Sequence, residues 1–307
     1  MSERLRQIRP WIRAARPRTV LLSLSGVMLG GFLAASAPVF HPVPILLAAL
    51  TAILLQILSN LANDYGDFKK GVDNAHRTGP QRVLQEGALT EKQMRVGIFL
   101  TVLLCLGSGL LLLLSVVLLQ GAWHKVLVFA LLGVAAIAAA LLYTLGHRPY
   151  GYRGLGDLFC FLFFGWVAVA GTYYLTAIGF DLAVLLPATA IGCCSNAVLN
   201  INNMRDYEND KAQGKNTLVV KLGLKKAFLY HVFLIVVPFL CFTAFMLVKR
   251  APWYTHAFWL LFPLFLMDLI TIRKTLATGV PDRLLPKQVV QSFLMALSFG
   301  LLYVLAV

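Results

Sequence analysis

Amide and carboxylate side chains cluster where an apolar segment of the chain ends, near residue 60. Asn60, Asn63, Asp64 and Asp67 follow the i, i+3, i+4, i+7 rule, so a helix that continues through them places all four on one face. Asp73 follows shortly afterwards. At an effective dielectric constant near 20, two carboxylates about 5 Å apart repel each other by roughly 3 kcal/mol. A divalent cation bound to oxygen ligands would turn this repulsion into affinity, so the cluster predicts a metal site.

A second cluster of the same residue types occurs later in the chain. Asn203, Asp206 and Asp210 repeat the spacing of three and then four residues, directly after Asn202. Cationic residues follow both clusters: Lys69, Arg77 and Lys215. The repeat divides one membrane domain, residues 1–307, into two weakly related halves of about 19–145 and 155–306. We expect the two clusters to converge as the two sides of one site.

A third polar stretch, residues 143–157, lies between the two halves. Its glycines and its proline predict a compact loop. Arg148 and three tyrosines in this stretch are suited to an anionic and partly apolar ligand: Tyr143, Tyr150 and Tyr152.

Carboxylate clusters with lysine and arginine beside them are suited to a substrate that carries a diphosphate. Magnesium is usually held by one or two carboxylates and completes its octahedron with phosphate oxygens. Ionisation of an allylic diphosphate places negative charge on the leaving group, where fixed cations help most. A site embedded in lipid would also let a polyprenyl tail lie among helices while its charged head stays at the membrane surface.

The composition indicates a polytopic, all-α membrane protein. Of the 307 residues, 59% are hydrophobic and 13% are charged, whereas soluble domains contain about a quarter charged residues. Nine apolar segments are long enough to cross a bilayer. They cover roughly residues 19–38, 44–66, 93–118, 125–145, 155–177, 183–205, 226–248, 255–272 and 288–306.

The basic residues sort strongly by membrane side. Of the 27 lysines and arginines, 24 lie before the first segment or in every second connection, which leaves Lys125, Lys249 and Arg250 on the other side. This asymmetry places the N-terminus and the long loops in the cytoplasm. The net charge of +14 is therefore explained by topology, and it does not indicate binding to nucleic acid.

Three stretches together resemble the UbiA superfamily of intramembrane aromatic prenyltransferases. They are Asn60-x-x-Asn63-Asp64-x-x-Asp67-x-x-x-Gly71-x-Asp73, Asp206-x-x-x-Asp210 and the loop from Tyr143 to Gly156. Within the superfamily, Arg148-Pro-Tyr-Gly-Tyr-Arg-Gly-Leu-Gly and Gly214-Lys215-x-Thr217-Leu are similar to the branch that prenylates 1,4-dihydroxy-2-naphthoate in menaquinone biosynthesis. Asp157 departs from the glutamate expected after Leu-Gly in that branch.

The resemblance implies a nine-helix bundle and a role for each polar residue. Asp64, Asp67 and Asp73 would bind one Mg²⁺, and Asp206 with Asp210 a second. The amides of Asn60, Asn63, Asn202 and Asn203 would complete or orient these ligand sets. Phosphate oxygens would meet Lys69, Arg77, Arg148 and Lys215, and the prenyl cation would face Tyr143, Tyr150 and Tyr152. The substrates would be a polyprenyl diphosphate and dihydroxynaphthoate, at the cytoplasmic side of the inner membrane.

Three other interpretations are open on the sequence alone. The acceptor could be another aromatic compound, such as 4-hydroxybenzoate, haem or a chlorophyllide. Acidic helix ends and repeated halves also occur in cation-coupled transporters. Finally, the aspartates could be charged helix ends that pair with nearby lysine and arginine. Asp268, inside the eighth segment, has no evident partner in the sequence.

Overall fold

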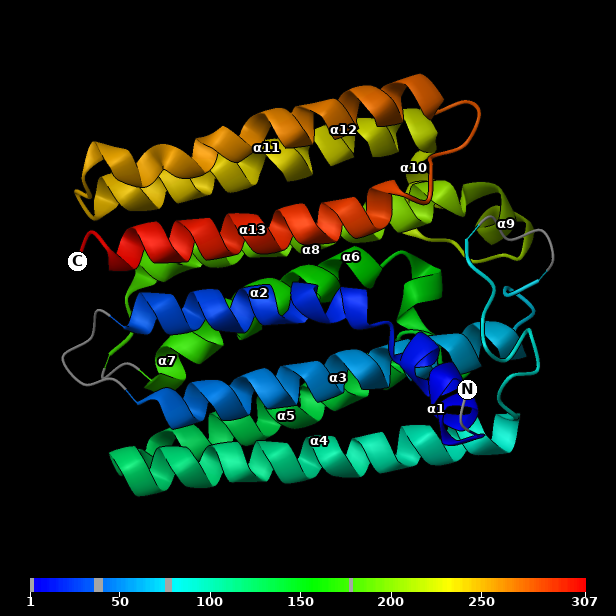
Figure 1. Cartoon of the computed structure of the whole chain (residues 1–307), viewed down its shortest axis with the longest axis horizontal. Coiled ribbons are helices and arrows are strands. Elements are labelled where there is room, and N and C mark those ends of the chain that lie inside the picture. Colours follow the sequence, from blue (N-terminus) through cyan, green and yellow to red (C-terminus); the bar gives the residue numbers. More distant parts are fainter. Residues whose placement is uncertain (1–2, 36–40, 75–78, 177–178) are drawn as a thin grey trace.

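The computed structural model describes residues 3–35, 41–74, 79–176 and 179–307, with side chains from residue 7 onward. The described residues form helices joined by loops and turns, without a β-strand. Nine helical spans in this part of the chain are long and apolar enough to cross a membrane, as the sequence predicts. Figure 1 shows them side by side, with the N- and C-termini at opposite ends of the bundle.

The first four spans and the sixth and seventh are each one α-helix, the sixth after a short lead-in. These are α2 (Pro17–Ala34), α3 (Pro42–Lys69), α4 (Glu91–Gln120), α5 (Trp123–Leu142), α8 (Leu185–Arg205, after η3, Leu182–Val184) and α11 (Leu224–Val248). The fifth span is continuous through α6 (Gly156–Cys160), η2 (Phe161–Gly171, with the wider turns of a π-helix) and α7 (Thr172–Thr176). The last two are η4 (Trp253–Leu261) with α12 (Phe262–Thr275), and α13 (Leu284–Val304).

Local sequence signals account for several helix ends. Thr90 and Gln93 form a reciprocal capping box at the start of α4, which satisfies backbone N–H groups that have no partner within the helix. Gly121 ends the same helix in a left-handed conformation, with φ of +63°, a backbone geometry that glycine adopts without strain.

Helices outside the membrane spans were not predicted from the sequence. α1 (Glu3–Ala15) precedes the first span, and η1 (Tyr150–Arg153), α9 (Tyr207–Ala212) and α10 (Leu218–Leu222) lie in connections. α1 is rich in arginine and contains Pro10, so it lacks the long apolar run that marks a spanning helix. It is held by packing, because Ala14 and Trp11 join a cluster with Leu61 of α3 and Met94 of α4.

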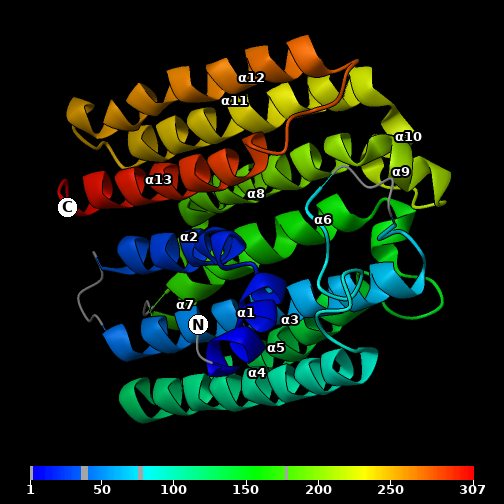
Figure 2. The same cartoon turned by 45° about the vertical axis from the view of Figure 1, so that its right-hand side comes forward.

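The second half of the bundle has the denser core. Aromatic rings from α11, η4, α12 and α13 pack face to edge, including Phe239, Phe242, Phe258, Phe265 and Phe299. α8 lies beneath them and is the most buried span. In the first half, α5 is the least buried span, and it lies with α3 and α4 on the side of the bundle away from α11, α12 and α13 (Figure 2).

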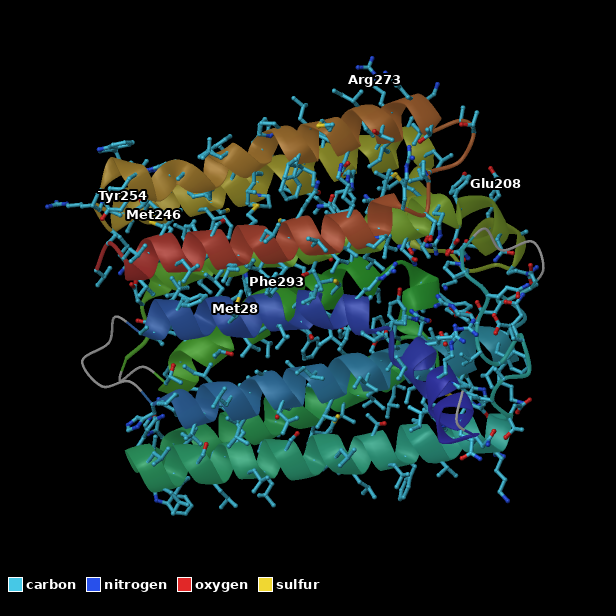
Figure 3. The ribbon with its side chains drawn as sticks, in the orientation of Figure 1. Met28, Glu208, Met246, Tyr254, Arg273 and Phe293 are labelled. Atoms are coloured by element: carbon cyan, nitrogen blue, oxygen red, sulfur yellow. The ribbon has the colours of Figure 1, made fainter. Side chains whose placement is uncertain are left out.

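Polar side chains gather at one end of the bundle. Figure 3 shows this end around Glu208 and Arg273, with Tyr254 at the opposite end and Met28 and Phe293 between them. α9, α10 and the connections after α3 and α5 lie at the Glu208 end (Figure 1). The long basic loops therefore share one end of the molecule, as their charge predicts.

Candidate active site

A cavity of about 850 Å³ lies within the bundle, polar at one end and apolar at the other. α2, α3, α5, η2 and α8 contribute much of its wall. Polar side chains on the wall come from both sequence clusters and from the connections between them. They include Arg16, Asn63, Asp64, Asp67, Arg82, Tyr143, Tyr150, Asn202, Arg205, Asp206, Asp210 and Lys215.

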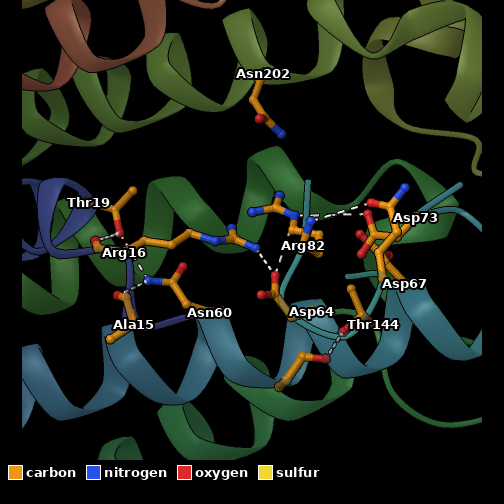
Figure 4. A network of polar contacts seen from close by, with 12 residues as sticks. Ala15, Arg16, Thr19, Asn60, Asp64, Asp67, Asp73, Arg82, Thr144 and Asn202 are labelled. Atoms are coloured by element: carbon orange, nitrogen blue, oxygen red, sulfur yellow. Dashed lines mark hydrogen bonds and ion pairs between the residues drawn. The ribbon is translucent and has the colours of Figure 1, made fainter. Parts of the chain in front are cut away.

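The first wall of the polar end is the last part of α3, which continues as a helix to Lys69, as the sequence predicts. Asp64 and Asp67 are only 2% and 5% exposed. Asp64 forms an ion pair with Arg16, and Arg82 Nε lies 3.5 Å from its Oδ1. Figure 4 shows both cations reaching the same oxygen of Asp64. Asp67 accepts a 2.6 Å hydrogen bond from the Tyr152 hydroxyl.

The second wall is the junction of α8 and α9. Arg205 Nε and Nη2 donate to the two oxygens of Asp206 at 2.9 and 2.6 Å. Arg205 also donates to Asn202 Oδ1 at 2.8 Å and pairs with Asp282 in the connection to α13. Figure 4 shows Asn202 pointing from α8 toward the aspartates of α3.

Lys215 joins the two walls. Its ammonium nitrogen lies 3.0 Å from Asp67 Oδ2 and 4.0 Å from Asp210 Oδ1. Burial alone would lower the pKa of Lys215, but the charges of Asp67 and Asp210 raise it above its ordinary value. Asn209 of α9 also donates to Val72 O, just after α3, at 2.9 Å. The two acidic clusters therefore lie close together at one end of the cavity, which is the convergence that their spacing predicts.

The junction of α1 and α2 positions Arg16. This residue has a left-handed backbone, with φ of +50°, and it precedes Pro17, which disfavours a helical conformation for the residue before it. Asn60 Nδ2 donates to Ala15 O at 2.9 Å and to Thr19 Oγ1 at 3.0 Å. Thr19 Oγ1 in turn donates to Arg16 O at 2.9 Å. The turn therefore projects the guanidinium of Arg16 into the cavity.

The loop between the halves supplies tyrosines to the same end. Tyr143 and Tyr150 line the cavity, and the Tyr150 hydroxyl donates to Ala139 O at 2.8 Å. Burial, and next the negative charge of Asp67, raise the pKa of Tyr152. The phenol of Tyr152 is therefore neutral at physiological pH and donates a hydrogen bond to Asp67.

The same loop packs directly on α3. Thr144 lies so close to Gly66 that a Cβ at Gly66 would be 2.6 Å from Thr144 Cβ.

The donor atoms fit a hard divalent cation that is also held by its substrate. Asn63 Oδ1 is buried and accepts no hydrogen bond from the described residues, and its side chain lies on the cavity wall beside Asp64. In the part of the chain that the structure describes, no three His, Cys, Asp or Glu side chains gather into a self-sufficient metal site. Mg²⁺ needs only one or two carboxylates when phosphate oxygens complete its shell, so this donor set fits Mg²⁺.

Comparisons with known proteins agree with this geometry. The sequence model of the UbiA prenyltransferase family matches residues 23–283. The chain belongs to the UbiA prenyltransferase family. A 1,4-dihydroxy-2-naphthoate octaprenyltransferase of Escherichia coli K12 is 41% identical, over 92% of this chain and 94% of its own length. A protein of the same name from Haemophilus influenzae is 42% identical, over 84% and 83%.

Solved structures support the fold of this UbiA family member. A UbiA homolog from Archaeoglobus fulgidus bound to GPP and Mg²⁺ superposes with a TM-score of 0.64, covering 96% of this chain and 99% of its own. An apo UbiA homolog from Aeropyrum pernix K1 has a TM-score of 0.61, with coverage of 92% and 94%. Their sequence identities are 16% and 17%, so these likenesses concern the fold alone.

Several residues that the sequence singled out lie away from the cavity of this UbiA protein. Asn60 turns toward the α1–α2 junction and is fully engaged there, so its place is structural. Lys69 is half exposed and pairs with Glu91 at 2.7 Å. It is the last residue of α3 and does not share the helix face that carries the aspartates. Arg148 is exposed in its loop. Asn203 is buried but does not contribute to the described wall.

Three further residues that the sequence analysis named lie off the cavity wall or outside the described residues. Asp73 is buried behind the wall, 3.9 Å from Arg82 Nε. Arg77 lies outside the described residues. Asp157 is buried at the start of α6 and does not belong to the cavity wall. Outside the site, Asp268 pairs with Lys287 of α13, which provides the partner that the sequence did not reveal.

Three arginines of this UbiA site were not selected from the sequence: Arg16, Arg82 and Arg205. Each contacts an aspartate of the two clusters. Charge and composition alone do not separate them from the other basic residues that set membrane topology. The available signal was that each stands in a stretch that resembles the family: Ala14-Ala15-Arg16-Pro17-Arg18-Thr19, Arg77-x-Gly79-Pro80-x-Arg82 and Asn202-Asn203-x-Arg205-Asp206.

Proposed function

We propose that the chain transfers a polyprenyl group from polyprenyl diphosphate to 1,4-dihydroxy-2-naphthoate, releasing carbon dioxide and diphosphate, as a step of menaquinone biosynthesis. The observation that carries the proposal is the meeting of two buried aspartate clusters across Lys215, above an apolar cavity. A charged head bound next to a hydrocarbon channel suits a lipid diphosphate. The names of relatives that match over most of this chain supply the acceptor.

The diphosphate head would bind at the polar end, between α3 and α9. Asp64 and Asp67, with Asn63 beside them, would hold one Mg²⁺, and Asp206 with Asp210 a second, while Asp73 supports the first set through Arg82. When bound, these ions neutralise negative charge on the departing diphosphate. Asn202 would orient Arg205 against Asp206. Arg16, Arg82 and Lys215 would contact phosphate oxygens.

Ion pairs within the protein stabilise the buried carboxylates of the site. Buried carboxylates without partners are costly, and Arg16, Arg82, Arg205 and Lys215 compensate them. A substrate that brings both anionic oxygens and cations can exchange partners with these pairs. The arginines and the lysine then turn from aspartate to phosphate without leaving any charge unpaired.

The reaction needs no base to remove a ring proton, because loss of carbon dioxide restores the aromatic ring. The allylic carbon–oxygen bond breaks, and its electron pair leaves with the diphosphate. The electron-rich ring carbon that carries the carboxylate then forms a bond to the allylic cation. The bond from this carbon to the carboxylate breaks next, carbon dioxide departs, and the electron pair restores the aromatic ring. The π faces of Tyr143 and Tyr150, which line the cavity, would stabilise the cation before capture.

The site would face the cytoplasm in the inner membrane. The basic residues that predict a cytoplasmic side belong to the loops at the end that carries the polar end of the cavity (Figure 3). Both water-soluble products, diphosphate and carbon dioxide, would be released on that side.

Purified protein tests the proposal directly. It would be incubated with dihydroxynaphthoate and a series of prenyl diphosphates, with and without Mg²⁺, and the products identified by mass. We expect a prenylated, decarboxylated naphthoquinol only when Mg²⁺ is present. Product formation from 4-hydroxybenzoate alone would contradict the acceptor, and full activity in excess chelator would contradict the metal requirement.

A further inference from the structure

Tyr152 contacts the site from outside the cavity. It is not among the described residues that line the wall, although the sequence places it beside tyrosines that do. Its hydroxyl donates a 2.6 Å hydrogen bond to Asp67 Oδ1, while the Lys215 ammonium donates to Asp67 Oδ2 at 3.0 Å. The two oxygens of this carboxylate therefore have different partners, one neutral and one cationic.

The turn that carries Tyr152, η1, is fixed by backbone contacts on both sides. Gly151 N–H donates to Tyr143 O at 3.0 Å, and a Cβ at Gly151 would lie 2.7 Å from the same oxygen. On the other side, Lys221 of α10 donates to Arg153 O. A side chain on a backbone held in this way presents its hydroxyl in a defined direction.

Two ammonium groups lie over the ring of Tyr152. Lys215 Nζ and Lys70 Nζ are 5.3 and 5.5 Å from the ring centroid, within the range at which a π face attracts a cation. Lys70 also donates to Gly146 O in the same loop at 3.1 Å. The ring therefore has a cationic neighbour on the loop besides Lys215.

The groups that hold the aspartates of the site differ in charge, and charge decides which of them can stay beside a bound metal ion. Arg16, Arg205 and Lys215 are cations, and a divalent cation repels them at short range. The hydroxyl of Tyr152 is neutral, so it is not repelled in this way. A hydrogen bond to one oxygen of a carboxylate leaves the other oxygen for a metal, and such donors orient metal ligands.

We propose that Tyr152 is a positioning residue for the metal site: it holds Oδ1 of Asp67 and leaves Oδ2, which Lys215 contacts, as the oxygen available to the metal ion. This inference rests on the proposed function, because that function assigns Asp67 to a Mg²⁺ site. When the diphosphate head binds, Lys215 turns from Asp67 to a phosphate oxygen, whereas Tyr152 keeps its hydrogen bond. Tyr152 thus acts through Asp67 and touches neither substrate.

The test compares Tyr152→Phe with a matched control, Tyr150→Phe. The first variant removes the hydroxyl from Asp67 and keeps the ring that the two lysines contact. The control lies in the same turn and also loses one hydroxyl hydrogen bond, of 2.8 Å, but the acceptor of that bond is the backbone oxygen of Ala139. Thermal melts without metal check that both variants fold.

The direct measurement is metal affinity, with Mn²⁺ in place of Mg²⁺ because both favour oxygen ligands and electron paramagnetic resonance distinguishes free from bound Mn²⁺. Each protein would be titrated with Mn²⁺ at a fixed concentration of geranyl diphosphate, without an aromatic acceptor. Loss of a group that orients a metal ligand lowers affinity by about 10–100-fold. We expect Tyr152→Phe to raise the Mn²⁺ concentration for half-saturation at least about 10-fold, and Tyr150→Phe to leave it at the wild-type value. Unchanged affinity in Tyr152→Phe, or an equal loss in both variants, would overturn the positioning role.

Turnover gives a second readout that a merely structural role would not move. In Tyr152→Phe, the Mg²⁺ concentration for half-maximal turnover should rise by a similar factor, while KM for the donor at saturating Mg²⁺ should stay near the wild-type value. A loss of thermal stability with unchanged Mg²⁺ dependence would overturn the proposal.

The Mn²⁺ titration also separates this inference from the proposed function, because it requires no acceptor. If the wild type transfers no prenyl group to dihydroxynaphthoate but the Mn²⁺ titrations differ as expected, the proposed function fails and the role of Tyr152 stands. If the wild type binds no Mn²⁺ with geranyl diphosphate, the metal assignment fails and the role of Tyr152 fails with it.

Discussion

The charge on each aspartate of the site is already compensated within the protein. Asp64 meets Arg16 and Arg82, Asp67 meets Lys215, and Asp206 meets Arg205. Taken alone, these ion pairs are consistent with a purely structural interpretation, in which charged helix ends pair with nearby cations. The burial of both partners argues for more, because two charges removed from water gain little net stability from each other. Their position on the wall of a large cavity favours exchange with an incoming ligand.

Asp64→Ala and Asp206→Ala should each lower turnover at least roughly 100-fold, since loss of groups that merely orient metal ligands already costs up to that factor. Turnover would be measured at saturating Mg²⁺, with circular dichroism to confirm helical content. Asp181→Ala is the matched control, because this carboxylate pairs with Lys249 at the far end of the bundle. Near-normal turnover in either site variant would contradict the metal assignment.

Lys215 and Lys69 make a matched pair of lysines, one inside the cavity and one outside it. Lys215→Met should lower the free energy of unfolding by about 3–5 kcal/mol, because it leaves Asp67 buried without its cation, and it should also lower turnover. Lys69→Met should change neither property. Chemical denaturation and donor kinetics on both variants check this expectation, and equal effects would show that proximity to the aspartates is not what matters.

The raised pKa of Lys215 also fixes the sign of a pH effect. A cation whose pKa is higher in the folded state than its ordinary value of 10.5 contributes stability that is fully present below 10.5. This contribution is lost only as the pH rises through the higher folded value. Between pH 6 and 9, the Lys215 ammonium is therefore charged throughout. Any change in turnover across this range must come from another group or from the substrates.

At the scale of elements, α3 carries polar residues with two different roles along one face. Asn63, Asp64 and Asp67 face the cavity, while Asn60, one turn earlier, binds the α1–α2 junction. The helical spacing correctly predicted a shared face for these residues. It could not predict where the N-terminal helix would cross that face, because α1 is positioned by long-range packing against Leu61 and Met94.

Asn60→Ala and Asn63→Ala should therefore differ in kind. Asn60→Ala removes donors to Ala15 O and Thr19 Oγ1, which should cost about 1–3 kcal/mol of stability and leave the Mg²⁺ concentration for half-maximal turnover unchanged. Asn63→Ala removes a buried oxygen without a hydrogen bond, and it should raise that Mg²⁺ concentration without destabilising the fold. Thermal melts and Mg²⁺ titrations distinguish the two. A shift in Mg²⁺ dependence for Asn60→Ala would return it to the metal site.

The spanning helices could be predicted because the bilayer demands long apolar runs, and all nine occur in the described chain close to their expected positions. α1 and α9 could not, because their stability comes from contacts with other parts of the fold. The same distinction holds for the site. Lys215 follows its aspartates closely in the sequence and was found, whereas Arg16 and Arg82 reach Asp64 from separate connections. Pairings of this kind depend on loop paths that composition and periodicity do not encode.

The orientation of the whole molecule is the remaining prediction from its charge. The termini lie at opposite ends of the bundle (Figure 1), and the sequence assigns 24 of the 27 basic residues to the N-terminal segment and to the connections on its side of the membrane. The positive-inside rule then places the site in the cytoplasm and Val307 outside. Alkaline phosphatase, which is active only outside the cytoplasm, would be fused after Val307 and, in a truncated chain, after Gly279. We expect activity from the first fusion and none from the second, because Gly279 precedes the last span. The reverse pattern would place the site on the outer face, where a cytoplasmic aromatic acid could not reach it.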